Sequence, residues 1–241
     1  REEFIVLSYD TDRYPFRKAL EAHVFKVPKL DELHRVWKKQ TGKEKLSYDD
    51  NLLLRKIMQN LPDDALFYKI YHQWIADIIA PHYDNKISYS KHPKMRVHLA
   101  ETGTVSDFHR DADVTGRPDQ INCYLPFTDV FDSSTLYCET NYNSDQYEPL
   151  NLKYGEALLW DGGMLKHGTY FNRTDNTRVI VTFDSPTKTI QASTPVEDNR
   201  KQKAFLSQTA ITKYILGQLQ VSAAAHRQKL SQSLHDAEDQ T

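Results

Sequence analysis

The sequence predicts a mainly β fold with helical additions, in which a double-stranded β-helix, or double-sheet jelly roll, fits best among sandwiches and barrels. Five short segments between residues 94 and 187 are rich in β-branched and aromatic residues, alternate with a period of two, and are separated by Gly, Asp, Asn and Pro. Residues outside this region carry apolar side chains at helical spacing. We expect a single domain: a helical part (1–93), a jelly-roll core (94–187) and a C-terminal helical extension (188–241).

Three stretches before the core are predicted helices. Residues 28–42 end at a glycine, and residues 47–62 begin with Ser47 as a possible N-cap and Asp50 three positions on. Residues 63–81 form the clearest helix, because apolar residues recur every three or four positions until a proline ends the pattern. We expect these helices to cover one outer face of the sheets.

The predicted strands are residues 94–100, 120–130, 134–142, 155–163 and 176–185. Beyond them, an apolar stripe predicts a C-terminal helix that docks on the core, with a homodimer through that helix as the alternative. The stripe consists of Phe205, Ile211, Tyr214, Ile215 and Leu219.

Composition excludes several classes of protein. A formal net charge of −2 and a pI near 6.6 give no electrostatic footprint for nucleic acid or an anionic membrane. No apolar run approaches the roughly 18 residues of a membrane span. The opening "REEFIVLSYD" is neither a signal peptide nor a transit peptide, and Cys123 and Cys138 make no disulfide framework. We therefore expect a cytoplasmic protein that acts on a small molecule, with both cysteines as packing residues.

Two His-x-Asp triplets are candidates for a metal site. About one such triplet is expected by chance in a chain of this composition, so its surroundings must decide. His82 and Asp84 lie in a loop after the clearest helix, with no strand beside them. His109 and Asp111 lie between two predicted strands, and residues i and i+2 at a strand edge point to the same side. We expect His109 and Asp111 to converge on one point inside the barrel.

The third ligand must come from elsewhere, and His167 in "LLWDGGMLKHGTYFN" is the best candidate. Two histidines and one carboxylate form the facial triad that holds Fe(II) and leaves positions open for substrate and oxygen. A structural zinc site more often has four ligands including cysteine, and neither cysteine has a partner at zinc-type spacing.

Arg178 begins the last predicted strand, 11 residues after His167. Alternation along that strand puts Arg178, Ile180, Thr182 and Asp184 on one face. A guanidinium that points into the cavity that holds a metal can bind a carboxylate through two parallel hydrogen bonds. The alternatives are a surface arginine or one paired with an acidic neighbour such as Asp175.

Together the pieces read His-x-Asp, 55 intervening residues, His-Gly, and Arg 11 residues after the second histidine, within a run of short strands. This pattern resembles the Fe(II)/2-oxoglutarate-dependent oxygenases, and among them the streptomycin-biosynthesis-type and phytanoyl-CoA-hydroxylase-like members. The resemblance covers about residues 94–186. It rests on "MRVHL", "FHRDAD", "NCYLPFTD", "GEALLWDGGMLKHG" and "NRTDNTRV".

The resemblance implies a role for each matching residue. His109, Asp111 and His167 match the iron ligands. Arg178 matches the residue that binds the C5 carboxylate of 2-oxoglutarate, and Asn122 resembles one that helps to hold the other end of this cosubstrate. Many members have Ser or Thr two residues after that arginine; here the position is Ile180, so the hydroxyl must come from Thr182 or a tyrosine.

The resemblance also implies the reaction. Fe(II), 2-oxoglutarate and O2 would hydroxylate a C–H bond and release succinate and CO2, with desaturation or ring formation as other outcomes of the same centre. The carboxylate of Asp111 favours hydroxylation over halogenation, because halogenating relatives have a small residue there. The family suggests secondary metabolism, such as antibiotic biosynthesis.

The substrate leaves a weaker signature. Arg96 and His98 share one face of a strand, as do Tyr137 and Glu139. If all four point inward, the pocket offers both signs of charge and suits a small polar molecule such as an amino acid or a natural-product intermediate. Outward or structurally paired side chains are the alternative. Two other functions are possible alternatives: a peptide or protein hydroxylase, and a non-catalytic jelly-roll binding module.

Overall fold

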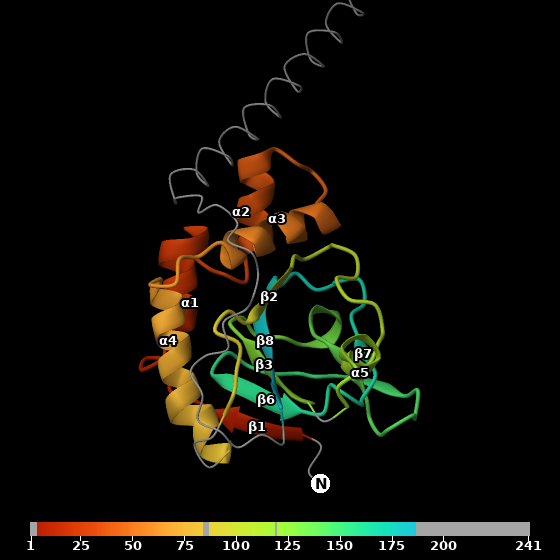
Figure 1. Ribbon diagram of the computed structural model, residues 1–241. Helices are drawn as coiled ribbons and strands as arrows, with labels where there is room; N and C mark the ends of the chain where they lie inside the picture. The colour runs from red at the N-terminus through yellow and green to blue at the C-terminus, as the bar shows by residue number, and fades with distance from the viewer. Residues whose placement is uncertain (1–3, 84–86, 119, 187–241) are drawn as a thin grey trace, which may run out of the picture. The chain divides into compact units, whose positions relative to one another are not determined.

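The computed structural model describes residues 4–83, 87–118 and 120–186 (Figure 1). The apolar stripe from Phe205 to Leu219 lies outside these residues, so the C-terminal helix and a homodimer through it stay predictions. Within the described part of the chain, no helix has the length and apolar character that a membrane crossing requires.

The chain divides into two compact units. The described residues of the larger one are 4–34, 46–83, 87–118 and 120–186, and they contain all the strands of the described part of the chain. In the smaller one the described residues are Arg35–Lys45, which carry most of helix α2 (Leu33–Thr41).

The larger unit contains two antiparallel sheets, which confirms the predicted mainly β architecture. The five-stranded sheet has the order β1 (Phe4–Ser8), β6 (Glu156–Trp160), β3 (Gln120–Pro126), β8 (Arg178–Pro186), β2 (Lys94–His98). The three-stranded sheet has the order β5 (Tyr147–Pro149), β4 (Tyr137–Glu139), β7 (His167–Gly168).

An apolar cluster joins the two sheets. It combines side chains of β3, β6 and β8 with side chains of β4 and the turns around it: Tyr124, Val130, Leu136, Cys138, Leu152, Leu158, Trp160, Leu165 and Ile180. Each is buried, and burial of such side chains is worth about 1.5–3 kcal/mol apiece. Cys138 is therefore a packing residue, as expected, and Cys123 is buried as well.

Strand alternation positions the functional side chains. On β8, four alternate residues line a pocket between the sheets: Arg178, Ile180, Thr182 and Asp184. Val179, Val181 and Phe183 are buried on the other face. The register of β2 against β8 pairs Arg96 with Ile180 and His98 with Arg178. The pocket face of the large sheet therefore brings polar residues of neighbouring strands together.

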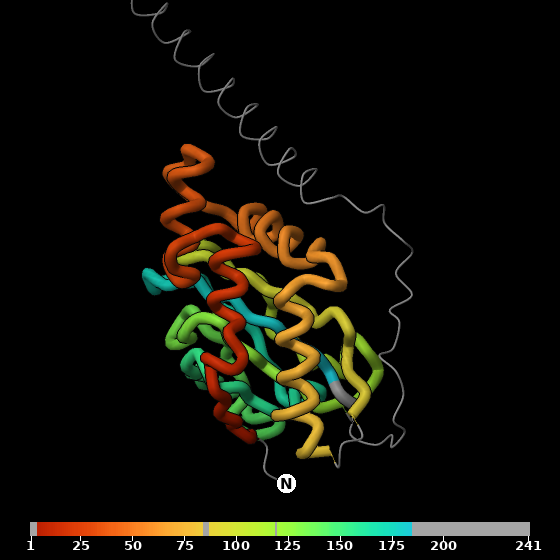
Figure 2. Tube along the Cα trace, turned by 90° about the vertical axis from the view of Figure 1, so that its left-hand side faces the viewer, coloured from red at the N-terminus to blue at the C-terminus, as the bar shows by residue number. Residues whose placement is uncertain are grey.

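The outer face of the large sheet is covered by helices, which lie in front of it in Figure 2. Helix α3 (Tyr48–Gln59) packs against β2 near its end. The covering helices are α1 (Phe16–Ala19) with its π-helical continuation η1 (Leu20–Phe25), and α4 (Leu66–Trp74) with η2 (Ile75–Ile79) and η3 (Ala80–Tyr83). Ring contacts attach them: Phe16 lies 5.1 Å from Phe127, and Tyr71 lies 5.8 Å from Phe183 of β8, between ring centroids.

The helix ends follow the sequence signals only in part. α3 begins with the expected capping box, in which the Asp50 carboxylate accepts the backbone N–H of Ser47 at 2.9 Å. The proline expected to end the third helix does not do so, because Pro81 lies in the 3-10 turn η3. Proline is compatible with the first turn of a helix, where its missing N–H would have no partner.

Candidate metal centre

His109 and His167 come from segments that pair as an isolated antiparallel β-bridge. Each backbone N–H donates to the other residue's carbonyl at 2.9 Å, and the two ring centroids lie 4.6 Å apart. Residues opposite each other in such a bridge project to the same side of the ladder. The backbone therefore places both imidazoles on one side of the loop that contains His109 and Asp111, called the metal loop below.

The Nδ1 atom of each imidazole is held by a backbone carbonyl two residues earlier. His109 Nδ1 lies 2.7 Å from the Asp107 carbonyl oxygen, and His167 Nδ1 lies 2.9 Å from that of Leu165. A carbonyl accepts only from N–H, so Nδ1 carries the proton and Nε2 is the nitrogen that can bind a metal. Both Nε2 atoms point to the same carboxylate, that of Asp111.

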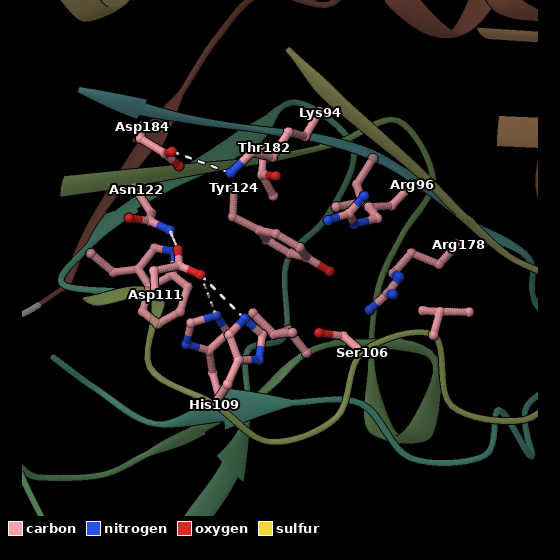
Figure 3. Close-up of a pocket in the computed structure, with 15 residues that line it drawn as sticks. Lys94, Arg96, Ser106, His109, Asp111, Asn122, Tyr124, Arg178, Thr182 and Asp184 are labelled. Atoms are coloured by element: carbon pink, nitrogen blue, oxygen red, sulfur yellow. Dashed lines mark hydrogen bonds and ion pairs between the residues drawn. The ribbon is translucent and has the colours of Figure 1, made fainter. Parts of the chain in front are cut away.

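Asp111 completes the cluster. Its Oδ1 lies 3.2 Å from His109 Nε2 and 3.7 Å from His167 Nε2, and its Oδ2 accepts a hydrogen bond from the Asn122 side chain (Figure 3). One ligand atom from each of the three residues lies within 4.8 Å of the others. Asn122 thus fixes the outer oxygen and leaves the inner one directed at the two histidines.

Two glycines allow this close packing. A Cβ on Gly162 would lie 2.6 Å from Asn122 Nδ2, and a Cβ on Gly168 would lie 2.7 Å from the Phe108 ring. The Gly162 carbonyl also accepts the backbone N–H of Asp111 at 3.1 Å. The motif glycines "DGG" and "HG" are therefore required sterically, because any side chain there would displace the neighbours of the ligands.

The electrostatics fit a cation-binding site. Burial alone would raise the pKa of Asp111, but the hydrogen bond from His109, the nearby His167 and the Asn122 bond together lower this pKa to about 2. The hydrogen bond to Asp111 raises the pKa of His109, whereas burial lowers the pKa of His167. A carboxylate that is ionised at neutral pH thus lies beside both imidazoles, and a metal would compete with protons for the ligand atoms.

Arg178 faces the same pocket with unsatisfied donors. The side chain is only 2% exposed, yet its Nε and Nη1 have no hydrogen-bond partner in the described part of the chain. Leaving buried donors unpaired is costly, and charged ones cost more than neutral ones. Nε and a terminal nitrogen form the edge that binds a carboxylate in a bidentate manner, so the site accommodates such a group.

One pocket contains the candidate metal centre. Its walls include the three clustered residues, Arg178, Asn122 and Thr182, so the structure brings together the predicted metal and cosubstrate residues. The remaining walls are Lys94, Arg96, Val105, Ser106, Tyr124, Leu136, Trp160, Ile180 and Asp184.

Of the four residues predicted to face the substrate, only Arg96 lines this pocket. His98 is fully buried, with Nε2 3.3 Å from the Thr102 carbonyl, and its pKa is lowered to about 3 by burial and then by the charge of Arg178. The Tyr137 hydroxyl donates to Asp132, and its ring packs on Tyr170 at 4.8 Å.

Glu139, the fourth of these residues, has a structural partner. Its fully buried carboxylate lies 3.4 Å from Arg110 Nη2 and accepts the Lys166 N–H at 2.8 Å. The expectation that Tyr137 and Glu139 converge on the pocket is not met, because neither lines it. Arg110 lies between two of the clustered residues, so Glu139 instead ties the metal loop to β4.

His109 and Asp111 were expected to converge because alternate residues at a strand edge point to the same side, and this reason is wrong. Only His109 is in a β-bridge, and Asp111 is the first residue of the short helix α5 (Asp111–Thr115). The chain turns between the two, and a backbone bond from Asp111 to Gly162 holds the turn. A His-x-Asp triplet can therefore converge without the alternation of a strand.

Among the described residues, His82 of the competing triplet joins no metal-ligand cluster, and the triplet as a whole is not tested. His82 lies in the turn η3, and Asp84 is outside the described part of the chain.

Trp160 belongs to the apolar cluster and also contacts a candidate metal ligand. It is buried, but its ring also lies edge-on to His167 at 4.6 Å, and its register partner on β3 is Asn122. Alternation along "EALLW" beside "QINCY" would have placed Trp160 on the face of Asn122, given the strand pairing.

No family model matches the chain. Streptomycin biosynthesis protein StrG of Streptomyces griseus is 26% identical over 197 residues, which covers 77% of this chain and 90% of StrG. The resemblance predicted from the motifs is confirmed. In structure, the chain is similar to the non-heme monooxygenase ThoJ in its nickel complex, with TM-score 0.51, 14% identity, and 95% and 96% of the two chains covered.

A second solved structure, AviO1 from Streptomyces viridochromogenes Tue57, matches with TM-score 0.50 and 14% identity, covering 80% of this chain and 94% of AviO1. At these identities the structural matches show a shared fold. The chemistry has to be argued from the pocket itself.

Proposed function

We propose that this protein is a non-haem oxygenase that uses Fe(II), 2-oxoglutarate and O2 to hydroxylate an unactivated C–H bond of a small polar molecule, with release of succinate and CO2. One observation carries the proposal: a single pocket holds the His109, Asp111 and His167 cluster together with the unpartnered, buried guanidinium of Arg178. The two antiparallel sheets are compatible with the jelly-roll core expected for such an enzyme.

The donor set suits Fe(II). Two imidazole nitrogens and one carboxylate oxygen form the facial triad, which leaves coordination positions open. A closed structural zinc site would need a fourth ligand, and neither buried cysteine belongs to the cluster. The carbonyls that hold both Nδ1 atoms and the Asn122 amide that holds Asp111 would orient the ligands before the metal arrives.

The pocket also fits 2-oxoglutarate. Arg178 would bind its C5 carboxylate, and Thr182, on the same face of β8, can add a hydroxyl where Ile180 cannot. Asn122 was expected to hold the cosubstrate directly, but its amide already donates to Asp111, so we assign it to orienting that ligand.

When bound, the iron centre with 2-oxoglutarate and O2 supplies the oxidation of a C–H bond, one oxygen atom entering the product and the other entering succinate. The chain's own residues bind and orient the reactants and exclude water. Trp160, Leu136 and Ile180 form the apolar part of the wall and are each buried. A dry wall matters because it strengthens the charge interactions of Arg178 and Asp111.

The name of StrG connects that relative with streptomycin biosynthesis. We extend this to a natural-product intermediate or an amino acid as the substrate class, and to antibiotic biosynthesis as the setting. Free amino acids and then short peptides in one turnover screen separate this class from a peptide hydroxylase.

The test is the O2-dependent conversion of 2-oxoglutarate into succinate by the purified chain with Fe(II). We expect turnover in the wild type, acceleration by the correct substrate, and a loss of at least 100-fold in His167→Ala. His82→Ala is the matched control and should keep wild-type turnover. A non-catalytic binding module would give no O2-dependent succinate, and equal turnover in both variants would contradict the site assignment.

A further inference from the structure

A second guanidinium in the pocket has no hydrogen-bond or ion-pair partner among the described residues. Arg96 projects from β2 into the cavity beside Arg178 of β8 (Figure 3). Its Nη1 is buried without a hydrogen-bond partner, and within the described residues no ion pair or hydrogen bond involves this side chain. Burial, then the charges of Arg55 and Arg178, lower the pKa of Arg96 to about 10, so it remains charged at neutral pH.

Neighbouring groups do not neutralise Arg96. Asp184 is paired with Lys94 at 3.3 Å, and Asp111 faces the two histidines. His98, on the same strand, is kept neutral because burial and Arg178 lower its pKa to about 3. Two like charges on adjacent strands destabilise the free pocket, which is the arrangement expected where anionic ligands supply the missing charge.

The charge balance shows how many anions are needed. Lys94 and Asp184 pair and cancel each other. A divalent metal, Arg96 and Arg178 together carry four positive charges, and Asp111 carries one negative charge, so the described pocket walls with the metal have three excess positive charges. Bound 2-oxoglutarate is a dianion and leaves one. Its tail would be bound by Arg178, whose Nε and Nη1 have no hydrogen-bond partner among the described residues. Arg96 is then the one pocket cation without a counter-charge.

We propose that Arg96 binds an anionic group of the substrate, a carboxylate or phosphate monoester, and so orients the substrate above the metal. This deepens and rests on the proposed function. It narrows the substrate class to small molecules with one negatively charged oxygen group placed away from the C–H bond to be oxidised.

The experiment uses the full chain loaded with Mn(II) and 2-oxoglutarate, with methyl phosphate and propionate as probes. Paramagnetic relaxation of the probe's ³¹P or ¹H nuclei by Mn(II) falls steeply with distance, so it reports binding in the pocket and not on the surface. We expect strong enhancement by at least one probe, a loss of at least fivefold in Arg96→Gln, and less than twofold change in Lys94→Gln. Lys94 is the matched control, because it is a cation two residues away on the same strand face.

Calorimetric titration with 2-oxoglutarate supplies the second readout. Arg96→Gln should keep the wild-type affinity within threefold, whereas Arg178→Gln should lose at least tenfold. Equal losses in both variants would overturn the inference, because Arg96 would then hold the cosubstrate. Unchanged probe relaxation in Arg96→Gln would overturn it as well. If the wild type binds neither Mn(II) nor 2-oxoglutarate, the proposed function itself fails, which distinguishes the two cases.

Discussion

Replacing Gly162 by alanine tests whether the turn after β6 orients the ligand Asp111. A Cβ there would lie 2.6 Å from Asn122 Nδ2 and 2.7 Å from its Cγ. Ordinary contacts between such atoms need about 3.5 Å, so the Asn122 amide must move by roughly 1 Å. A shift of that size breaks its hydrogen bond to Asp111 and frees the carboxylate to rotate.

The expected magnitudes follow from these two effects. Overpacking of this kind lowers the free energy of unfolding by about 1–3 kcal/mol. Loss of a group that orients a ligand typically lowers metal affinity by about 10–100-fold. Gly162 has no positive φ, so alanine is tolerated by the backbone, and the effect is steric alone.

The assay is competition of the chain with a chelating dye for Mn(II), at a temperature where circular dichroism shows each variant folded. Gly103→Ala is the control, because a Cβ at that glycine meets nothing within 4 Å. We expect Gly162→Ala to bind Mn(II) at least tenfold more weakly than Gly103→Ala. Affinities within twofold of each other would refute the view that packing against Asn122 orients Asp111.

Three further predictions address the cosubstrate, the second glycine and pH. Arg178→Lys keeps the charge but loses the planar pair of donors; we expect 2-oxoglutarate affinity to fall about 10–100-fold with Mn(II) affinity retained, as calorimetry would show, and an unchanged affinity would argue against a bidentate clamp. In Gly168→Ala the Cβ would lie 2.9 Å from the Phe108 Cα as well as against its ring, so backbone beside His109 must shift; we expect an unfolding free energy about 1–3 kcal/mol lower in urea titrations, and a loss below 0.5 kcal/mol would contradict the steric reading. The pKa of His98 is lowered to about 3 in the folded chain, so the unfolded chain binds the extra proton between pH 6.5 and 3 and stability falls as pH drops through that window. Through His98, the free energy of unfolding should be about 2 kcal/mol lower at pH 5 than at pH 7.5. In His98→Gln, urea titrations at these two pH values should differ by correspondingly less.

The sequence predicts well those features that depend on spacing and periodicity. The period-two segments located β2, β3, β4, β6 and β8, and the capping residues located the start of α3. The spacing of His109, Asp111, His167 and Arg178 selected four residues that the fold brings to one pocket. Such spacing carries information because the strands between these residues have fixed lengths and pairings.

The features that failed depend on tertiary pairing. Alternation put Tyr137 and Glu139 on given faces of β4, but it could not tell that this strand pairs with β5 and β7 and directs both residues away from the pocket walls. Strand β1 was missed because it is short, its residues are exposed or half-buried, and it becomes a strand only by pairing with β6. The charge imbalance at Arg96 likewise appears only once the partners of Lys94 and Asp184 are known.

The central claim is that His109, Asp111 and His167 hold Fe(II) and that Arg178 holds 2-oxoglutarate beside it. An anaerobic optical titration of the chain with Fe(II) and 2-oxoglutarate tests it most directly. We predict a weak visible charge-transfer band that saturates at one metal per chain, is absent in His109→Ala and His167→Ala, and is unchanged in His82→Ala. A band of wild-type intensity in both site variants, or no band in the wild type, would contradict the account.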